Sequence, residues 1–490
     1  MSTPDVDQKA ESKQVDVTHL EALPNPADAH NPNARVILSD EEKKLVRKID
    51  AKILPIMCAV GFLQFLDKTS LSYASVLGII KDTNLQGSEY ALLGSLFYIG
   101  YLTMQLPNSY LMQRFPLGRL VGTIVFLWGI VLACTSLGKN FSELAGLRFL
   151  LGFFEACVNP IFIMLTNTFY RKQEQVTRIG AWWLFNGFAS SLGGLVGYGI
   201  GQMDGVKSLW AWQWIMIILG SITCVVGIVV FFVLIDDPYS ARLHLTEDEK
   251  LIVADRLVDN GVYRTQEFKK DQVIEALKDQ KTWIFFFCAL LNNMTNGALT
   301  TFSTLITQGF GFSGLNSILL QMPSGICDVI LILIAGWIHS RTGDRLFTCV
   351  GLMVIAEVGL ILLVAVPSVG GKLCGLYLTY GYAAAYVLVI SSVAANTNGY
   401  TKKLVTNAMM IIGYTVGNII GPVIMIDGPK YVGGMVGCIS ANFVMILLMI
   451  YLRFSMARDN KRRAALGGEK LTSVDNDITD RQDPNFVYRL

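Results

Sequence analysis

Four ionisable residues stand inside stretches of sequence that are otherwise apolar. Asp67 is followed directly by Lys68 in FLQFLDKTSL, and Arg148 precedes Glu155 in LRFLLGFFEACVNP. A charged side chain at the centre of a lipid bilayer costs roughly 3 kcal/mol, so such residues usually face the protein interior and line a solute pathway. On a continuous helix, the spacing from Arg148 to Glu155 and on to Asn159 places all three on one face.

These residue types suit the joint handling of an anion and a proton. The planar guanidinium of Arg148 can donate two parallel hydrogen bonds to a carboxylate, whereas Lys68 acts as a point charge. A carboxyl group away from water can be tuned to exchange its proton near the working pH, which makes Asp67 and Glu155 candidates for proton coupling. Two alternatives stay open: Asp67 and Lys68 neutralise each other locally, or Arg148 and Glu155 have a structural role.

A second group of candidate residues is polar but uncharged. Amides and phenols can orient a ligand without a counter-charge, so this group is expected to recognise the neutral part of a substrate. Hydrogen bonding between helices is the alternative. The candidate substrate-binding residues of this kind are Asn292, Asn293, Asn296, Tyr386 and Asn418.

Other chemistry finds little support. Asp328 and Glu357 stand alone in apolar stretches, and the sequence assigns them no role. The four His residues lie in polar segments, and neither a zinc-binding spacing nor a phosphate-binding glycine loop is present. We therefore expect no enzyme activity, no cofactor, no metal and no nucleic-acid partner.

The rest of the sequence supplies the helices that must position these residues. The chain of 490 residues is 52% hydrophobic and 16% charged, against about 25% charged residues in soluble domains. Apolar stretches of about 20 residues recur, each long enough to cross a bilayer as a helix. We predict an all-α integral membrane protein with twelve transmembrane helices in two six-helix halves. The expected spans are 52–80, 91–113, 118–137, 143–169, 179–202, 211–235, 282–306, 315–339, 346–367, 373–396, 404–427 and 432–454.

Charge sets the expected orientation. Lys and Arg gather before the first span, in the even-numbered connections, and at and beyond the end of the last span, at Arg453, Arg458 and residues 461–463. Both termini are therefore expected in the cytoplasm. In the longest connection Thr246 precedes Glu249 by three residues, which predicts the capped start of a surface helix. The expected parts are a disordered cytoplasmic tail 1–50, an N-terminal half 51–235, a cytoplasmic linker 236–281, a C-terminal half 282–455 and a cytoplasmic tail 456–490.

Several motifs taken together resemble one family. They are FLDKTSL in the first expected span, LWGIV in the third, LRFLLGFFEACVNP in the fourth, LNNMTNG in the seventh, and ANTNGYTKK and GYTVGNIIGP around the tenth and eleventh. On these motifs the chain is identified as a member of the major facilitator superfamily. Within it the chain resembles the fungal branch of the anion:cation symporter family that contains the allantoate permeases.

The resemblance implies the major facilitator fold and a monomeric, proton-coupled importer of small organic anions in a plasma membrane. It places Asp67 and Glu155 at the usual protonation positions, and Lys68 and Arg148 at the basic ones. Many relatives carry Arg where this chain has Lys68, and the ammonium group of lysine acts as a point charge without the planar fork that Arg uses for bidentate capture of an anion. An allantoate-like ureidocarboxylate is the first substrate expected. A nicotinate or pantothenate carrier, an efflux carrier and a non-transporting nutrient receptor remain as alternatives.

Overall fold

The computed structural model describes residues 40–259, 268–426, 428, 430–466 and 477–490. Within these ranges the regular structure is helical. The helices are α1 (Asp40–Val76), α2 (Ile79–Asp82), α3 (Glu89–Arg114), α4 (Leu117–Thr135), α5 (Phe141–Glu155), α6 (Val158–Phe169), α7 (Lys172–Gly201), α8 (Ala211–Val233), α9 (Glu247–Asp259), α10 (Lys270–Lys278), α11 (Gln280–Gln308), α12 (Gly314–Leu319), α13 (Met322–Thr342), α14 (Arg345–Ala365), α15 (Val369–Thr379), α16 (Gly381–Asn396), α17 (Tyr400–Val423) and α18 (Val432–Leu466), with short 3-10 turns at Val206–Ser208 and Ala241–Leu243.

The helices agree with an integral membrane protein. In the described part of the chain, nine helical segments are long and apolar enough to cross a membrane. They lie where nine of the spans were expected. The helices at the remaining three places, α3, α7 and α11, are not among the nine. In α11 the polar residues Asn292, Asn293 and Asn296 fall within little more than one turn. The count of twelve spans therefore remains a prediction.

Two expected boundaries differ from the observed helices. Helix α1 begins at Asp40, so the disordered tail expected over 1–50 is wrong for residues 40–50; residues 1–39 lie outside the described ranges. The acidic first turn favours a helix start, and Leu45 and Ile49 are buried. At the other end α18 continues to Leu466, beyond the expected boundary at 455, and residues 477–490 fold back against neighbouring helices.

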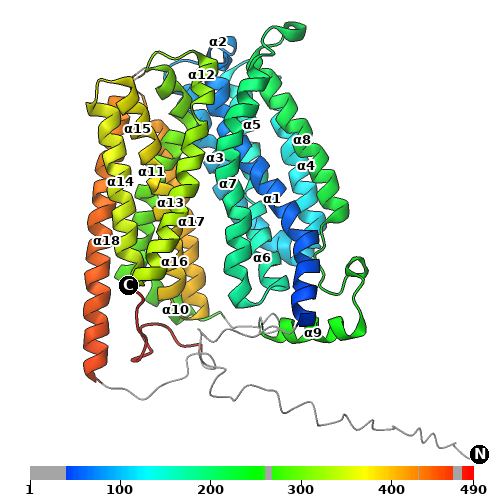
Figure 1. Ribbon diagram of the computed structural model, residues 1–490, viewed down its shortest axis with the longest axis vertical. Coiled ribbons are helices and arrows are strands. Elements are labelled where there is room, and N and C mark those ends of the chain that lie inside the picture. The colour runs from blue at the N-terminus through cyan, green and yellow to red at the C-terminus, as the bar shows by residue number, and fades with distance from the viewer. Residues whose placement is uncertain (1–39, 260–267, 427, 429, 467–476) are drawn as a thin grey trace, which may run out of the picture.

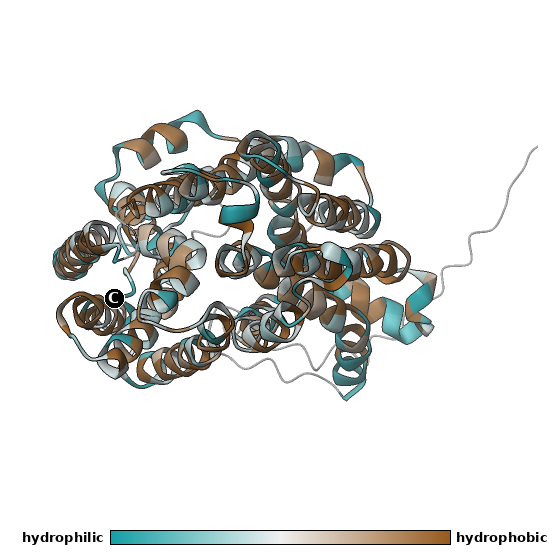
Figure 2. Cartoon of the chain, turned by 90° about the horizontal axis from the view of Figure 1, so that it is seen from above, coloured by the Kyte–Doolittle hydropathy of each residue, from teal (hydrophilic) through white to brown (hydrophobic). Residues whose placement is uncertain are grey.

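The helices form two bundles that stand side by side (Figure 1). The first bundle comprises α1 to α8 and the second comprises α11 to α18. Helices α9 and α10 lie at one end of the pair, here named the linker side, and α2 and α12 lie at the opposite end, the far side. Figure 2 shows hydrophobic residues along the helices and hydrophilic residues mainly in the connections. This distribution is what a lipid environment requires of the outer surface.

The bundles contact each other toward the far side. Ser72 Oγ of α1 lies 2.9 Å from Thr304 Oγ1 of α11. The Tyr90 hydroxyl donates to the Thr301 carbonyl at 2.7 Å, and the Ser95 hydroxyl donates to a carbonyl of α17 at 2.7 Å. These residues lie near the ends of α1 and α11 and the start of α3, all on the far side (Figure 1). The hydrogen bonds that join the bundles within the described ranges are therefore gathered at one end.

The linker is divided between the bundles. Helix α9 starts with the expected cap, because the Glu249 amide donates to Thr246 Oγ1 at 3.3 Å and the Thr246 amide donates to Glu249 Oε2 at 2.9 Å. It packs on the first bundle, where buried Arg256 pairs with Glu42 at 2.6 Å and also contacts Glu174. Helix α10 packs on the second bundle, where Glu275 lies 3.0 Å from Lys402 of α17. Each bundle thus holds its own part of the linker.

Candidate functional site

The charged candidates meet inside the first bundle. Lys68 Nζ on α1 lies 3.0 Å from Glu155 Oε1 on α5, and Glu155 is fully buried. Asp67 and Arg148 are also buried, and they interact electrostatically across the same two helices. Close contact between α3 and α5 helps to fix this arrangement. A Cβ at Gly152 would lie 1.8 Å from a carbonyl oxygen of α3, so only glycine allows this approach. The structure brings all four predicted charged residues together.

The charges are not fully satisfied by the protein. One terminal nitrogen of Arg148 is buried without a hydrogen-bond partner among the described residues. Neither Glu155 oxygen has hydrogen-bond geometry to such a partner, although Lys68 is close enough for an ion pair. Buried polar atoms in native proteins are usually paired, so an unpaired cationic donor beside an ion pair is typical of a binding site. The arrangement can therefore bind an anion.

Trp128 is part of this site, and sequence reasoning missed its role. Its indole Nε1 donates to Asp67 Oδ2 at 2.6 Å, and the Ser70 hydroxyl donates to Asp67 Oδ1 at 3.4 Å. Trp128 is completely buried on α4. The signal available in the sequence was the LWGIV motif, which carried the family resemblance without indicating a contact to α1. Asp67 thus accepts hydrogen bonds from Trp128 and Ser70, while Lys68 forms its ion pair with Glu155. These contacts disagree with the alternative in which Asp67 and Lys68 only neutralise each other.

The expected stripe on the fourth span is interrupted. Helix α5 ends at Glu155 and α6 begins at Val158, so Arg148 and Asn159 do not lie on one continuous helix. Asn159 nevertheless stays half-buried and interacts with Tyr101 of α3. The break falls directly after Glu155, at a short turn that precedes Pro160. Proline cannot donate its backbone nitrogen and disfavours helical geometry in the residue before it, which favours a helix break in this region.

The uncharged candidates form a network within the second bundle. Asn296 Nδ2 on α11 donates to Asn418 Oδ1 on α17 at 2.8 Å, and the Tyr382 hydroxyl donates to Asn296 Oδ1 at 3.0 Å. Asn418 Nδ2 approaches Asn293 Oδ1 at 3.4 Å. Asn292 does not join them: its side chain is buried, and neither polar atom has a partner among the described residues. The contacts among Asn293, Asn296 and Asn418 are hydrogen bonds between helices α11 and α17, which was the alternative to a substrate-binding role for these residues.

Four tyrosines connect the charge cluster with the second bundle. Tyr414 of α17 lies 6.0 Å from Tyr98 and 6.2 Å from Tyr101, both on α3, measured between ring centroids. On its other side Tyr414 stacks with the predicted site residue Tyr386 of α16 at 6.0 Å. Lys68 interacts electrostatically with Tyr98, Tyr101 and Tyr414. Tyr98 and Tyr101 were not predicted as site residues, although their spacing of three places them on one helix face.

The two unassigned acids lie elsewhere. Asp328 on α13 and Glu357 on α14 each have one buried carboxylate oxygen without a partner among the described residues.

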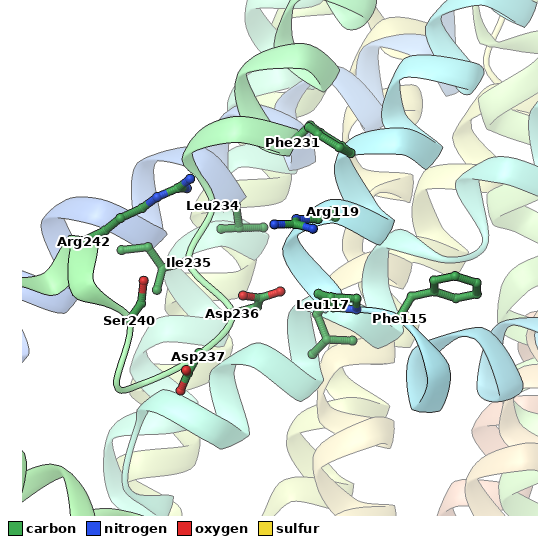
Figure 3. Close-up of a pocket in the computed structure, with 11 residues that line it drawn as sticks. Phe115, Leu117, Arg119, Phe231, Leu234, Ile235, Asp236, Asp237, Ser240 and Arg242 are labelled. Atoms are coloured by element: carbon green, nitrogen blue, oxygen red, sulfur yellow. The ribbon is translucent and has the colours of Figure 1, made fainter.

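A surface pocket also lies away from the cluster. Figure 3 shows it at the start of α4, with a volume of about 590 Å³, where Arg119 and Asp236 are among its lining residues. None of the predicted site residues lines this pocket. The central cluster therefore remains the candidate site.

The two bundles of membrane-spanning helices, with a buried charge cluster facing an aromatic and amide group, define a multi-pass membrane transporter. The family model described as Major Facilitator Superfamily matches residues 57–422. The chain belongs to this superfamily, as its motifs predicted.

Similar proteins support the assignment. An uncharacterised transporter of Schizosaccharomyces pombe is 34% identical, covering 100% of this chain and 98% of the relative. The allantoate permease of Saccharomyces cerevisiae is 32% identical over 93% of this chain and 88% of its own length. A thiamine pathway transporter of the same yeast is 33% identical over 91% and 86%. The relatives are transporters, and this chain is a transporter, not an enzyme.

Solved structures share the fold. A bacterial homologue of the lysosomal transporter Spinster, in an inward-facing state, gives a TM-score of 0.63 at 14% identity, covering 81% of this chain and 94% of the other. A D-xylose-proton symporter gives 0.62 at 14% identity, over 83% and 97%. At this identity the likeness concerns the fold alone.

Proposed function

We propose that the chain imports a small organic anion together with protons, by alternating access of the two bundles. The observation that carries the proposal is the buried cluster in which Lys68 pairs with Glu155 at 3.0 Å while a donor of Arg148 has no hydrogen-bond partner among the described residues. Asp67 and Glu155 serve as the proton-coupling residues. Lys68 and Arg148 bind the negative group of the substrate.

Charge balance supplies the coupling. With both carboxyl groups ionised, two cations and two anions cancel, and the cluster offers little net attraction to an anion. A proton on Glu155 removes the charge that holds Lys68, so the ammonium group becomes available to a substrate carboxylate. Binding of the proton and of the anion then favour each other, which is the reciprocal linkage that symport requires.

The contact pattern supports the cycle. The hydrogen bonds that join the bundles within the described ranges lie toward the far side, so in this proposal the linker side is the end that opens. In parallel-repeat transporters of this kind, the bundles rock about a site near the membrane midplane. The linker side is the cytoplasmic side in this proposal, as the positive charge of the connections supports, and the membrane is the plasma membrane.

For the substrate we favour an allantoate-like ureidocarboxylate. The allantoate permease of Saccharomyces cerevisiae is 32% identical over most of its length. A ureido group carries several hydrogen-bond donors and acceptors. The side chains of Asn293, Asn296 and Asn418 in the second bundle carry both amide N–H donors and carbonyl acceptors. Tyr386 supplies an apolar face beside them, and the buried amide of Asn292 has capacity for further hydrogen bonds.

A second substrate class has support of its own. The thiamine pathway transporter is 33% identical to the chain over comparable lengths, so a vitamin or vitamin precursor is the alternative cargo. The aromatic group of Tyr98, Tyr101 and Tyr414 would suit a flat heterocyclic ring, because aromatic faces stack.

Uptake measurements test the proposal. Labelled allantoate, ureidosuccinate, nicotinate, pantothenate and thiamine are offered to cells lacking their own carriers, at acid and neutral external pH, with and without a protonophore. We expect one anion to accumulate at acid pH and the protonophore to abolish accumulation. Glu155→Gln mimics the protonated carboxyl group, so the variant should still bind the anion, but its accumulation should fall roughly tenfold or more, about 1.4 kcal/mol of lost driving force, because protons no longer exchange at this residue.

The matched control is Glu143→Gln, because Glu143 lies on the same helix α5 but is exposed, and among the described residues its carboxylate accepts hydrogen bonds only from Lys139 and Asn140, just before the helix. It should leave uptake unchanged in a chain that reaches the membrane normally. Accumulation that ignores pH, the protonophore and Glu155→Gln would show that proton coupling is wrong. Binding of an anion without accumulation would favour the receptor alternative.

A further inference from the structure

A basic pocket lies on the linker side of the second bundle, away from the charge cluster. Its volume is about 670 Å³. The end of α18, the start of α11 and the segment 477–490 form its walls, and the transport cycle proposed above uses none of its residues. It is lined by six cationic side chains but only two acidic ones, so its charge is strongly positive.

The acids of the pocket are already engaged. Asp459 pairs with Lys281 at 2.9 Å, and Asp279 pairs with Lys402 at 2.7 Å. Arg463 is also occupied, since it donates to the carbonyls of residues 480, 483 and 486. Four lining cations have no ion pair or side-chain hydrogen bond with any described residue, and all four are exposed. They are Lys278, Arg458, Arg462 and Arg481.

The walls of the pocket are fixed by the protein itself. Asn460 of α18 exchanges two hydrogen bonds of 2.8 Å with the backbone of Tyr488. The Lys281 ammonium lies 3.8 Å from the centre of the Tyr488 ring, and Arg463 lies over the same ring at 4.8 Å. Tyr488 is 1% exposed, so the segment that carries it is packed and not loosely attached. These four cations therefore surround a preformed cavity.

Helix α18 joins the cations to the lipid-facing surface. Phe454, Arg458 and Arg462 are spaced by four residues and lie on one face of the helix. Phe454 is 61% exposed and Tyr451, one turn earlier, is 49% exposed, although both are large and apolar or aromatic. Aromatic residues of this kind mark the membrane interface. The same face of α18 therefore carries exposed aromatic residues, which acyl chains can contact, followed by cations, which can bind a negatively charged group.

Orientation of the chain in the membrane does not require such a pocket. Cations that only obey the charge rule for membrane topology can be scattered over exposed helix ends, as Arg47 of α1, Arg114 of α3 and Arg341 of α13 are on the same side. A cavity lined by four cations that lack an ion pair with any described residue instead matches a compact group that carries several negative charges. Basic pockets beside transmembrane helices bind phosphorylated lipid head groups for this reason.

We propose that this pocket binds the head group of a phosphorylated inositol lipid, with the acyl chains lying along Tyr451 and Phe454. Arg458, Arg462 and Arg481 contact the phosphates, and Lys278 adds a further positive charge from α10. The ligand is a membrane lipid and not a soluble anion, because the cations continue the lipid-facing stripe of α18. A lipid with a single negative charge would match the four cations poorly.

Binding of an acyl-labelled phosphatidylinositol phosphate to the purified full-length protein in neutral detergent tests the proposal. The variant Arg458→Gln/Arg462→Gln/Arg481→Gln should bind it about 100-fold more weakly, from roughly a fivefold contribution of each cation. The matched control Arg47→Gln/Arg114→Gln/Arg341→Gln removes the same charge from the same side and should change binding less than about threefold. If the triple pocket variant unfolds, Arg458→Gln and Arg462→Gln are measured singly, each with about a fivefold loss expected.

Three results would overturn the proposal. Equal weakening by the pocket and control variants would mean that surface charge in general attracts the lipid. Equal binding of phosphatidylserine and the inositol lipid would show that the pocket does not require a head group with several negative charges. Binding of soluble inositol phosphate as tight as that of the lipid would show that the acyl chains contribute nothing and that the site takes a soluble anion.

Discussion

Lys402 is the residue whose removal should disturb the linker side most. Its ammonium group lies 2.7 Å from Asp279, 2.7 Å from Asp480 and 3.0 Å from Glu275. These acids come from the start of α11, the segment 477–490 and α10, so one cation joins three separate parts of the chain to α17. The side chains of Lys402 and Asp480 are each 1% exposed. We predict that Lys402→Met detaches the segment 477–490 and α10 from the second bundle.

The magnitude follows from burial. Removing one partner of a buried ion pair leaves the other charge uncompensated and costs about 3–5 kcal/mol. A domain of about 150–250 residues, which is the size range of the second bundle, changes its unfolding midpoint by roughly 2–4 °C per kcal/mol. The thermal unfolding midpoint of Lys402→Met in detergent should therefore fall by about 6–20 °C. Lys402→Met/Asp480→Asn should recover part of the loss, because one of the stranded charges is gone.

The assay combines thermal unfolding with limited proteolysis of residues 477–490, which should become cleavable in Lys402→Met. Lys270→Met is the control, since Lys270 is exposed on α10 and has no partner among the described residues. A midpoint for Lys402→Met within about 2 °C of the control, with the segment still protected, would refute the reasoning.

Three further predictions concern stability. Burial alone would raise the pKa of Asp279, but the ammonium group of Lys402 and a backbone N–H donor outweigh burial and lower the pKa below 3.8. A carboxyl group with a lowered pKa stabilises the folded state above its unfolded pKa, so the unfolding midpoint should fall as the pH drops below that value. Asp279→Asn should abolish this pH dependence. Trp128→Phe removes the donor to the buried carboxylate of α1 and should cost about 1.5–3 kcal/mol in denaturant unfolding, whereas an unchanged midpoint would contradict the hydrogen bond. Gly152→Ala should cost about 1–3 kcal/mol by separating α3 from α5, while Gly146→Ala on the same helix, with open space around it, should be neutral or stabilising.

Much of the fold could be predicted because a membrane-spanning helix is determined mainly by the apolar residues of its own segment. Apolar length gives the spans, and the cap at Thr246 and Glu249 could be read from a spacing of three residues. The start of α1 at Asp40 could not, because its first turns are polar and become helical through packing of Leu45 and Ile49. The ends of helices depend on such tertiary contacts more than on composition.

The charged part of the site could also be predicted, because charge in an apolar stretch is expensive wherever it occurs. Asp67, Lys68, Arg148 and Glu155 were found by that argument, and the structure brings them together. Trp128 could not be found in this way, since a tryptophan in a membrane helix has no unusual cost until its N–H faces a carboxylate on another helix. The roles of all these residues in transport remain predictions.

The separation of asparagines shows a second limit. Asn292 and Asn293 are adjacent in sequence, so they point in directions about 100° apart on α11. Asn293 and Asn296 reach α17, whereas Asn292 does not. Helical spacing gives relative directions on one helix, but the identity of the neighbouring helix decides which direction meets a partner. That neighbour is set by the three-dimensional packing.

The division of the linker has a practical consequence. Helix α9 is fastened to the first bundle through Arg256, and α10 is fastened to the second through the acids around Lys402. Exposed positions such as Leu251 on α9 and Lys270 on α10 therefore move with different bundles. With spectroscopic labels at these two positions, the distance between the labels would report the proposed rocking of the bundles from outside the membrane, without substituting any predicted site residue.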